Sequence, residues 1–178
     1  MRVAVTGTPG TGKSTAVERL ESESDALDEF DVIHLNDAIH EEDLIVEHDD
    51  DRDSAVADLD AVAEYLDDRA DERDDVLFES HLAHRFDADR VVVFRCHPEE
   101  LTRRLTERGE PEEKAAENAE SEALDLILSE AVREHGEENV YEVDATDLDP
   151  SETAAAIEAV VAGEREPQAG TVSFMDYL

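Results

Sequence analysis

The sequence has one cysteine and no long apolar run, and each shortage excludes a kind of structure. Because Cys96 stands alone among 178 residues, the chain can form no internal disulfide and no cysteine-based zinc site. Cys96 follows an apolar run at residues 91–94, so we expect its thiol to be buried and inert. No apolar stretch is long enough to span a bilayer, and no signal region precedes the first predicted strand. We expect a soluble, cytoplasmic protein with no membrane partner.

Lysine is nearly absent, and the charge is almost all of one sign. Lys13 and Lys114 are the two lysines, and 51 Asp and Glu residues against 15 Lys and Arg give a net charge of −36. Such acidity can mean disorder, but apolar residues recur at strand and helix spacings and favour a folded domain. The other interpretation is adaptation to the salty cytoplasm of a halophile, where salt screens the repulsion among the carboxylates. So acidic a surface disfavours direct, charge-driven binding of nucleic acid.

The first fifteen residues, MRVAVTGTPGTGKST, carry the clearest motif. Residues 3–5 are an apolar run typical of a buried parallel strand, and residues 15–20 have helical spacing. Between them, GTPGTGKS at residues 7–14 matches the phosphate-binding pattern of glycines, a lysine and a hydroxyl residue. A chance glycine-rich turn is the alternative, and the order of strand, loop and helix disfavours it. We therefore predict a nucleoside triphosphate site.

Each position of this loop has its own chemical reason. Gly10 and Gly12 lack Cβ atoms, so the backbone N–H groups can turn inward around phosphate oxygens. The helix that starts near Lys13 adds its positive dipole end at the same place. Lys13 is expected to reach the β- and γ-phosphates, Ser14 to hold Mg²⁺, and Thr15 to extend the cradle.

The remaining periodicity predicts an α/β fold. Apolar runs mark five strands, at residues 3–5, 30–35, 76–78, 91–94 and 140–143. Helical patterns lie between or after them, at residues 15–20, 56–66, 98–109, 111–136 and 150–163. This alternation implies a doubly wound, five-stranded parallel sheet with helices on both faces. Ligands of such sheets bind at the carboxyl ends of the strands.

The connecting segments carry more specific expectations. Asn36 is expected to cap a short helix, and the highly charged residues 46–53 are expected to form an exposed loop. Residues 111–136 have the pattern of one long helix. The last helix has Asp149 as its cap and Glu152 to complete a capping box. The tail after it is expected to be either disordered or docked through its aromatic end.

The end of the third predicted strand offers Glu79 and His81. A carboxylate at this place faces the phosphate loop in many nucleotide-hydrolysing folds, where it holds Mg²⁺ directly or through water. His81 lies two residues on and could orient a water or an acceptor. A solvated strand end is the alternative for Glu79, and a structural role is the alternative for His81. We interpret His84 as structural.

Arginines on the helix over residues 98–109 could neutralise a transferring phosphoryl group. Arg103, Arg104 and Arg108 lie on this helix, and the four-residue spacing puts the last two on one face. The break at residues 109–111 is a natural hinge for a segment that closes over the site. Ion pairs between these arginines and nearby glutamates are a serious alternative in so acidic a protein.

Together these motifs resemble one family. Residues 7–15, 79–81, 104–109 and 117–123 are similar to the isoenzyme-6 type of adenylate kinase, also called the coilin-interacting nuclear ATPase family, and most closely to its archaeal members. The resemblance implies a P-loop NTPase fold of the nucleoside monophosphate (NMP) kinase type. It divides the chain into a single domain, an NMP-binding insert, a lid and a C-terminal tail, at residues 1–163, about 34–53, about 107–117 and 164–178.

The same resemblance implies a broad-specificity kinase that converts ATP and AMP to two ADP and also hydrolyses ATP. It implies a role in late maturation of the small ribosomal subunit and its rRNA, with a platform ribosomal protein as partner, and we expect a monomer. The residues that match the family's ATP site are Gly10, Gly12, Lys13, Ser14, Thr15 and, in the lid, Arg108. Glu79 and His81 match an acidic-x-His motif. The expected catalytic residues are Lys13, Glu79, His81 and Arg108, and the expected Mg²⁺ ligands are Ser14 and Glu79.

The insert departs from the family pattern. His40 stands where the family often has an arginine near the acceptor phosphate, and Arg52, the one arginine of the insert, lies among aspartates. A dianionic phosphate needs more positive charge than these residues offer. The alternative function is therefore a nucleotide-switched ribosome-assembly ATPase with little NMP kinase activity. An unrelated small-molecule kinase is disfavoured by the motifs downstream of the phosphate loop.

The charge balance predicts that the fold loosens in dilute buffer. At molar salt the screening length falls to about 3 Å, which relieves the repulsion among the carboxylates. Circular dichroism with and without added salt measures the effect, and full stability in the absence of salt would contradict the prediction.

Overall fold

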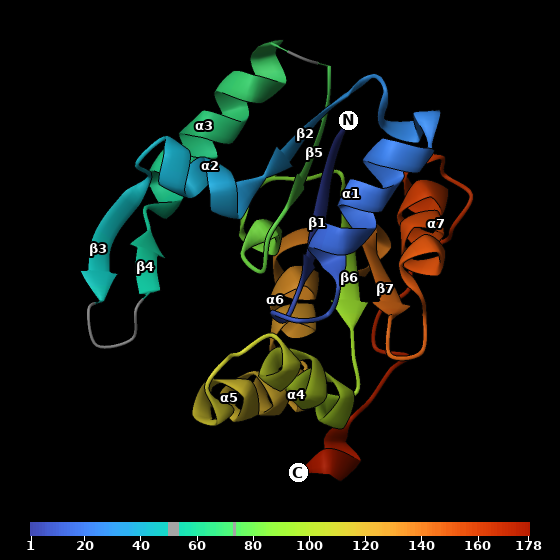
Figure 1. Cartoon of the computed structure of the whole chain (residues 1–178). Coiled ribbons are helices and arrows are strands. Elements are labelled where there is room, and N and C mark those ends of the chain that lie inside the picture. Colours follow the sequence, from blue (N-terminus) through green and yellow to red (C-terminus); the bar gives the residue numbers. More distant parts are fainter. Residues whose placement is uncertain (50–53, 73) are drawn as a thin grey trace.

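Five parallel strands form the central sheet of the protein (Figure 1). The structure, a computed structural model, describes residues 1–49, 54–72 and 74–178. The strands stand in the order β2 (Phe30–His34), β5 (Asp75–Glu79), β1 (Arg2–Gly7), β6 (Arg90–Arg95) and β7 (Val140–Asp144). On the two sides of β1, Val5 pairs with Glu79 and Gly7 pairs with Phe94. The predicted α/β fold and its five parallel strands are confirmed.

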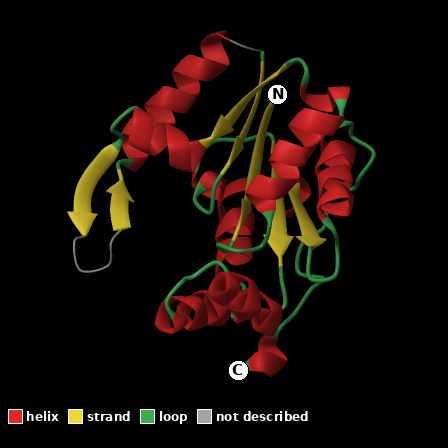
Figure 2. Ribbon diagram, in the orientation of Figure 1, coloured by secondary structure: helices red, strands yellow, loops and turns green. Residues whose placement is uncertain are grey.

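Helices cover both faces of this sheet, as predicted (Figure 2). One face carries α1 (Lys13–Glu23) and α7 (Pro150–Val161), and the other carries α2 (Leu35–Glu41), α3 (Leu59–Glu72) and α6 (Leu126–His135). Alternate residues of a strand point to opposite faces, so β1 gives Val3 and Val5 to one core and Ala4 to the other. Among the described residues, no helix is both long and apolar enough to cross a bilayer.

Two further helices close the carboxyl end of the sheet. α4 (Pro98–Glu107) and α5 (Glu112–Ala123) pack against each other beyond the ends of β1 and β6 (Figure 1). Cys96, Leu101, Leu105 and Ala115 form a small apolar cluster between them. Burial raises the pKa of the Cys96 thiol to about 12. Cys96 is therefore buried and unreactive, as expected.

Two expectations for the segment after β2 are wrong. Helix α2 begins at Leu35 with His34 as its N-cap, so Asn36 lies inside the helix and accepts a hydrogen bond from Ser80 Oγ (3.0 Å) instead. Residues 46–49 of the predicted loop belong to strand β3 (Ile45–Asp49), which pairs antiparallel with β4 (Ser54–Ala57), and residues 50–53 lie outside the described residues. Backbone hydrogen bonds hold these two strands together. Because neither strand belongs to a buried sheet, the hydropathy of the sequence does not reveal them.

The predicted long helix over residues 111–136 is broken into α5 and α6. Between them Asp125 has a left-handed φ of 53°. A residue with a Cβ atom pays roughly 1–2 kcal/mol for that conformation, and the Asp125 carboxylate forms an ion pair with buried Arg95. A partner far away in the sequence thus ends the helix, which local periodicity cannot indicate.

The C-terminal segment docks on the sheet, which was one of the two alternatives. Gln168 bridges to Tyr141 in β7, and the chain then runs to the end of the sheet beside α4 (Figure 1). Phe174 is buried there, with its ring 5.3 Å from that of His97. Phe174 therefore anchors the aromatic end of the tail, whereas Met175 and Tyr177 beyond it are exposed.

The start of α7 provides a stability test, because the predicted capping box is present. Asp149 accepts from the N–H of Glu152 (2.9 Å), whose carboxylate accepts from Asp149 N–H (2.8 Å). Asp149→Ala should lower the free energy of unfolding by about 1 kcal/mol, measured by urea denaturation in molar salt. Glu18→Ala is the control, since it removes one exposed negative charge from α1. Its change in stability measures only the reduced repulsion among carboxylates. Equal stability of Asp149→Ala and wild type would contradict the prediction.

Candidate active site

The phosphate loop joins β1 to α1 at the carboxyl edge of the sheet. Gly12 is the N-cap of α1 and has a φ of 93°, a left-handed conformation that side chains with a Cβ atom rarely adopt. The first α-helical hydrogen bond of α1 is from Ala16 N–H to the Gly12 carbonyl (3.0 Å). The N–H groups of residues 13–15 therefore have no partner within the helix and lie at its positive dipole end. The loop is built to bind an anion.

The tip of the loop lies directly against α4. Gly10 also has a φ of 93°, and a Cβ atom placed on it would lie 2.9 Å from Leu105 Cδ2. Leu105 belongs to the apolar cluster between α4 and α5. The absence of a side chain at residue 10 thus lets the phosphate loop pack against the helix that carries Arg104 and Arg108.

Lys13 is buried beneath this loop. Its Nζ lies 3.5 Å from the Thr8 carbonyl oxygen. Burial lowers the pKa of Lys13 to about 8, an effect that the charge of Glu79 opposes and the charge of Arg108 reinforces. A bound polyphosphate would favour the charged ammonium, because it brings negative charge to a site from which water is largely excluded.

Glu79 lies at the end of β5 and connects the end of β2 to the phosphate loop. Ser14 Oγ donates to Glu79 Oε2 (3.0 Å), and His34 Nδ1–H donates to Glu79 Oε1 (2.9 Å). Glu79 is 2% exposed, so it is not a solvated strand end. A hydroxyl and a carboxylate are the hard oxygen donors that Mg²⁺ prefers. Ser14 and Glu79 therefore fit the ion that the sequence predicts.

His34 is a residue of this site that the sequence analysis missed. Its hydrogen bond to Glu79, and a second one to Glu21 Oε2 (3.2 Å), raise the pKa of His34 to about 9. His34 is therefore a cation at neutral pH and neutralises part of the charge of Glu79. The signal was available, because His34 directly follows an apolar run, as Glu79 does.

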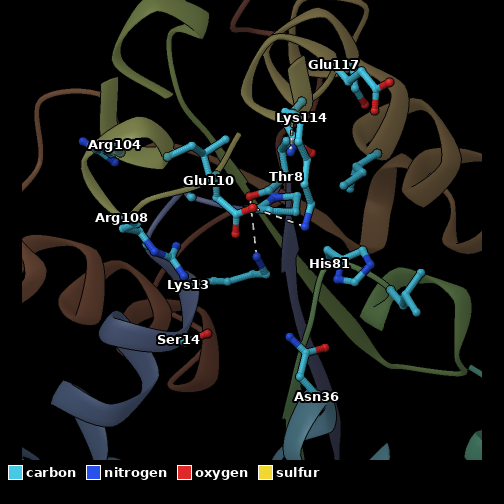
Figure 3. A pocket seen from close by; sticks show the side chains of 18 of the residues that line it. Thr8, Lys13, Ser14, Asn36, His81, Arg104, Arg108, Glu110, Lys114 and Glu117 are labelled. Atoms are coloured by element: carbon cyan, nitrogen blue, oxygen red, sulfur yellow. Dashed lines mark hydrogen bonds and ion pairs between the residues drawn. The ribbon is translucent and has the colours of Figure 1, made fainter. Parts of the chain in front are cut away.

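His81 and His84 follow β5 and differ in their surroundings. Burial and the charge of Lys13 lower the pKa of His81 to about 4, so its imidazole is neutral. His81 lines the cavity described below (Figure 3). His84 is buried with Thr6 Oγ1 3.0 Å from its Nδ1 and Glu130 Oε2 2.9 Å from its Nε2. These partners support the structural interpretation of His84.

The three candidate arginines divide into two kinds. Arg103 and Arg104 both donate to the Glu100 carboxylate, and Arg104 also donates to the carbonyl of Thr146 (2.9 Å). The ion-pair alternative thus holds for these two. Arg108 is exposed at the C-terminal end of α4 and points toward the side of the loop where Lys13 lies (Figure 3). The structure therefore brings Arg108 to the phosphate loop and commits Arg103 to surface pairs.

A cavity of about 1120 Å³ is lined by Lys13, Ser14, His81 and Arg108, whereas Glu79 and His34 are not among its lining residues. Its lining from the phosphate loop and α1 includes Gly10, Gly12, Lys13, Ser14 and Thr15, and its lining from α4 and α5 includes Arg104, Arg108 and Lys114. Away from α5 the cavity is lined by Asn36 and His81 (Figure 3). Arg85 is also among its lining residues. His40 is exposed on α2 and is not among the lining residues, and Arg52 lies outside the part of the chain that the structure describes.

The fold and the loop define the class of protein, an α/β P-loop protein of the NMP-kinase type. Two solved structures share this fold. Shikimate kinase from Bacteroides thetaiotaomicron has a TM-score of 0.60 at 17% identity and covers 92% of this chain and 98% of its own. Deoxyadenosine kinase from M. mycoides has a TM-score of 0.53 at 13% identity and covers 91% of this chain and 100% of its own. At these identities the likeness concerns the fold alone.

Sequence comparison places the chain in a family. Residues 3–125 match the family model described as an AAA domain. A protein of Natronomonas pharaonis named "Putative adenylate kinase" is 61% identical over 178 residues and covers both chains completely. Proteins of the same name from Halobacterium salinarum and Methanocaldococcus jannaschii are 56% and 32% identical, and each covers this chain completely and at least 97% of its own length. The chain therefore belongs to this family of AAA-domain proteins, together with these archaeal relatives.

The His34–Glu79 pair predicts a pH dependence of stability in the absence of nucleotide and Mg²⁺. The pKa of His34 in the folded protein, about 9, lies above its ordinary value of 6.5, so the folded state binds the proton more tightly. Its contribution is complete below pH 6.5 and is lost as the pH rises through 9. Wild type should therefore lose more stability than His34→Gln between these pH values, measured by urea denaturation. Parallel curves for the two proteins would contradict the prediction.

Proposed function

We propose that the protein is a nucleoside monophosphate kinase, which transfers the γ-phosphoryl group of ATP to AMP or a related monophosphate and hydrolyses ATP more slowly. The observation that carries this proposal is the single cavity that joins the phosphate loop to Asn36 and His81. Pockets for one small ligand span roughly 300–1,000 Å³, so about 1120 Å³ leaves room for a donor and an acceptor. The name shared by the archaeal relatives supports the same activity.

The donor half of the cavity supplies positioning and charge. We assign Gly10, Gly12 and Thr15 to the cradle around the phosphates, Lys13 and Arg108 to the charge that develops on the transferring group, and Ser14 and Glu79 to Mg²⁺. Mg²⁺, when bound, would neutralise the phosphate oxygens. The hydrogen bond from Ser14 to Glu79 and the burial of Lys13 support this assignment.

The acceptor half supplies hydrogen bonds more than charge. Because its pKa is near 4, His81 is neutral and can orient an acceptor oxygen without adding repulsion against Lys13. We assign acceptor binding to the insert at residues 34–53 and closure to the lid at residues 107–117, both within a domain of residues 1–163. Closure would keep water out, so that the monophosphate accepts the phosphoryl group.

A second function is favoured by one observation, the scarcity of cations in the acceptor half. Arg85 is the arginine that lines it among the described residues, and Arg85 is paired with Glu130 (3.0 Å). We therefore also propose a nucleotide-switched assembly factor of the isoenzyme-6 type, which binds a basic platform protein of the small ribosomal subunit during rRNA maturation. Its acidic surface would steer such a partner. In both proposals the protein acts in the cytoplasm as a monomer.

Measuring ADP formation from ATP in molar salt, with and without AMP, separates the two functions. An AMP-dependent burst of ADP is expected for the kinase. Hydrolysis that is indifferent to AMP and stimulated by a platform ribosomal protein is expected for the assembly factor. ADP formation without AMP dependence would therefore contradict the kinase proposal.

Lys13→Ala should abolish both activities, because it removes the buried charge beneath the phosphates. Arg133→Ala is the matched control: it removes an exposed cation of α6 that pairs with Glu134 and lies outside the cavity lining. Turnover retained by Lys13→Ala would overturn the assignment of the donor site.

A further inference from the structure

A buried arginine lies at the end of β6, directly behind the phosphate loop. Arg95 is 1% exposed and is surrounded by three carboxylates. Its Nε donates to Glu122 Oε1 (2.7 Å), and one terminal nitrogen donates to Glu142 Oε1 (2.6 Å). The other terminal nitrogen donates to Asp125, the left-handed residue between α5 and α6. One cation thus holds the end of α5, the start of α6 and the middle of β7.

The cluster continues into the phosphate loop through Glu122. The hydroxyl of Thr8 donates to Glu122 Oε2 (2.5 Å), and Thr8 is 1% exposed. The carbonyl of Thr8 accepts from Thr11 Oγ1 (2.9 Å) and faces Lys13 Nζ at 3.5 Å. Thr8 is therefore the residue through which the buried cluster sets the shape of the loop and the resting place of Lys13.

The cluster also continues into the C-terminal segment through Glu142. Glu142 Oε2 accepts from the N–H and the hydroxyl of Thr171 (2.7 and 3.0 Å) and from Val172 N–H (3.3 Å). The ring of Phe174 lies over the Arg95 guanidinium, 5.4 Å from its centroid. Phe174 is 8% exposed, whereas the next residue, Met175, is 62% exposed.

Two of the three carboxylates, Glu122 and Glu142, are buried, whereas the Asp125 side chain is 28% exposed. One cation cannot neutralise both buried carboxylates, so the donors around them are essential. A buried carboxylate that loses a donor is strongly destabilised in its charged form, because water does not reach it. Glu122 Oε2 accepts from Thr8, and Glu122 Oε1 accepts from Cys96 N–H (3.1 Å) as well as from Arg95. Glu142 Oε2 accepts from the backbone of residues 171–172 and from the Thr171 hydroxyl. Any shift at one end of the cluster must therefore be accommodated at the other.

We propose that Arg95 is a positioning residue of the nucleotide site: through Glu122 it fixes Thr8 of the phosphate loop, and residues 171–174 hold Arg95 in place. Its kinetic readout rests on the proposed function. Glu122 lies at the C-terminal end of α5, whose first half belongs to the assigned lid. The same cluster thus provides the fixed end about which α5 moves, and it keeps that end in register with the phosphate loop.

The test begins at Thr8. Thr8→Val keeps the shape of the side chain and removes the hydroxyl, and a displacement of about 1 Å at a catalytic group can cost up to about a hundredfold in rate. We expect kcat to fall about tenfold with a smaller change in KM for ATP. Thr8→Ser keeps the hydroxyl and should recover most of the loss. A structural role alone would change the folded fraction and leave kcat of the folded protein unaltered.

The link to the tail is tested with a double-mutant cycle. Phe174→Ala should also lower kcat, and the Thr8→Val/Phe174→Ala protein should lose less than the product of the two single losses, because both act through one chain of contacts. Met175→Ala is the control on the same segment and should keep the wild-type kcat. All proteins are assayed in molar salt at a temperature where circular dichroism shows them fully folded. Losses that multiply, or an unaltered kcat in either single variant, would overturn the proposal.

Two further measurements cover the cases in which a variant does not fold or the protein is not a kinase. Arg95→Lys should show the same fall in kcat, and if it does not fold, the Thr8 and Phe174 cycle decides alone. If wild type binds MgATP but transfers nothing to AMP, the kinase proposal fails. The double-mutant cycle is then carried out by measuring the Kd for MgATP of each variant. There the single variants should bind about threefold more weakly, again with less than multiplicative loss. Multiplicative losses in Kd would then refute the positioning role on its own.

Discussion

The pairing of β1 between β5 and β6 is the interaction on which the site depends. Because Val5 lies opposite Glu79, the end of β5 is level with the start of the phosphate loop, and the Glu79 carboxylate reaches Ser14. Because Gly7 lies opposite Phe94, Arg95 falls directly behind the loop on the other side. Backbone hydrogen bonds thus set the positions of both buried charges before any side chain contributes. The loop itself adds only the turn and the helix dipole.

At the site, the burial of individual charged side chains matters more than how many charges of each sign the chain carries. Lys13 is one of two lysines in a chain with a net charge of −36, and it sits where a compact ammonium can face phosphate. Arginine serves elsewhere, because its planar fork can hold a carboxylate with two bonds, as Arg69 holds Asp31 at 2.6 and 2.7 Å. Two carboxylates beside the phosphate loop, Glu79 and Glu122, are both buried and held by donors. Their negative charge is therefore fixed in place and partly neutralised, whereas other glutamates, among them Glu110 and Glu130, line the cavity itself.

The parts of this structure that the sequence predicts are those whose causes are local. Four of the five strands are buried on both faces and so read as apolar runs, whereas β2 at the edge of the sheet is mostly half-buried. The capping box of α7 lies within four residues. The parts that it missed have distant causes. The break at Asp125 depends on Arg95, the role of His34 depends on Glu79, and the hairpin of β3 and β4 depends on backbone pairing. The roles of Arg108 and His81 remain predictions, because they concern contacts with the nucleotides.

The docked C-terminal segment also has a consequence for the order of folding during synthesis, because it contacts parts of the chain that are made much earlier. The phosphate loop at residues 7–14 is synthesised well before Thr171 and Phe174, which lie more than 150 residues further along the chain. At about 5–20 residues per second, several seconds or more separate the two events. A nascent chain therefore carries the nucleotide motif long before the contacts behind Arg95 can form. The finished site therefore requires residues 171–174, and a chain that lacks them cannot yet assemble it.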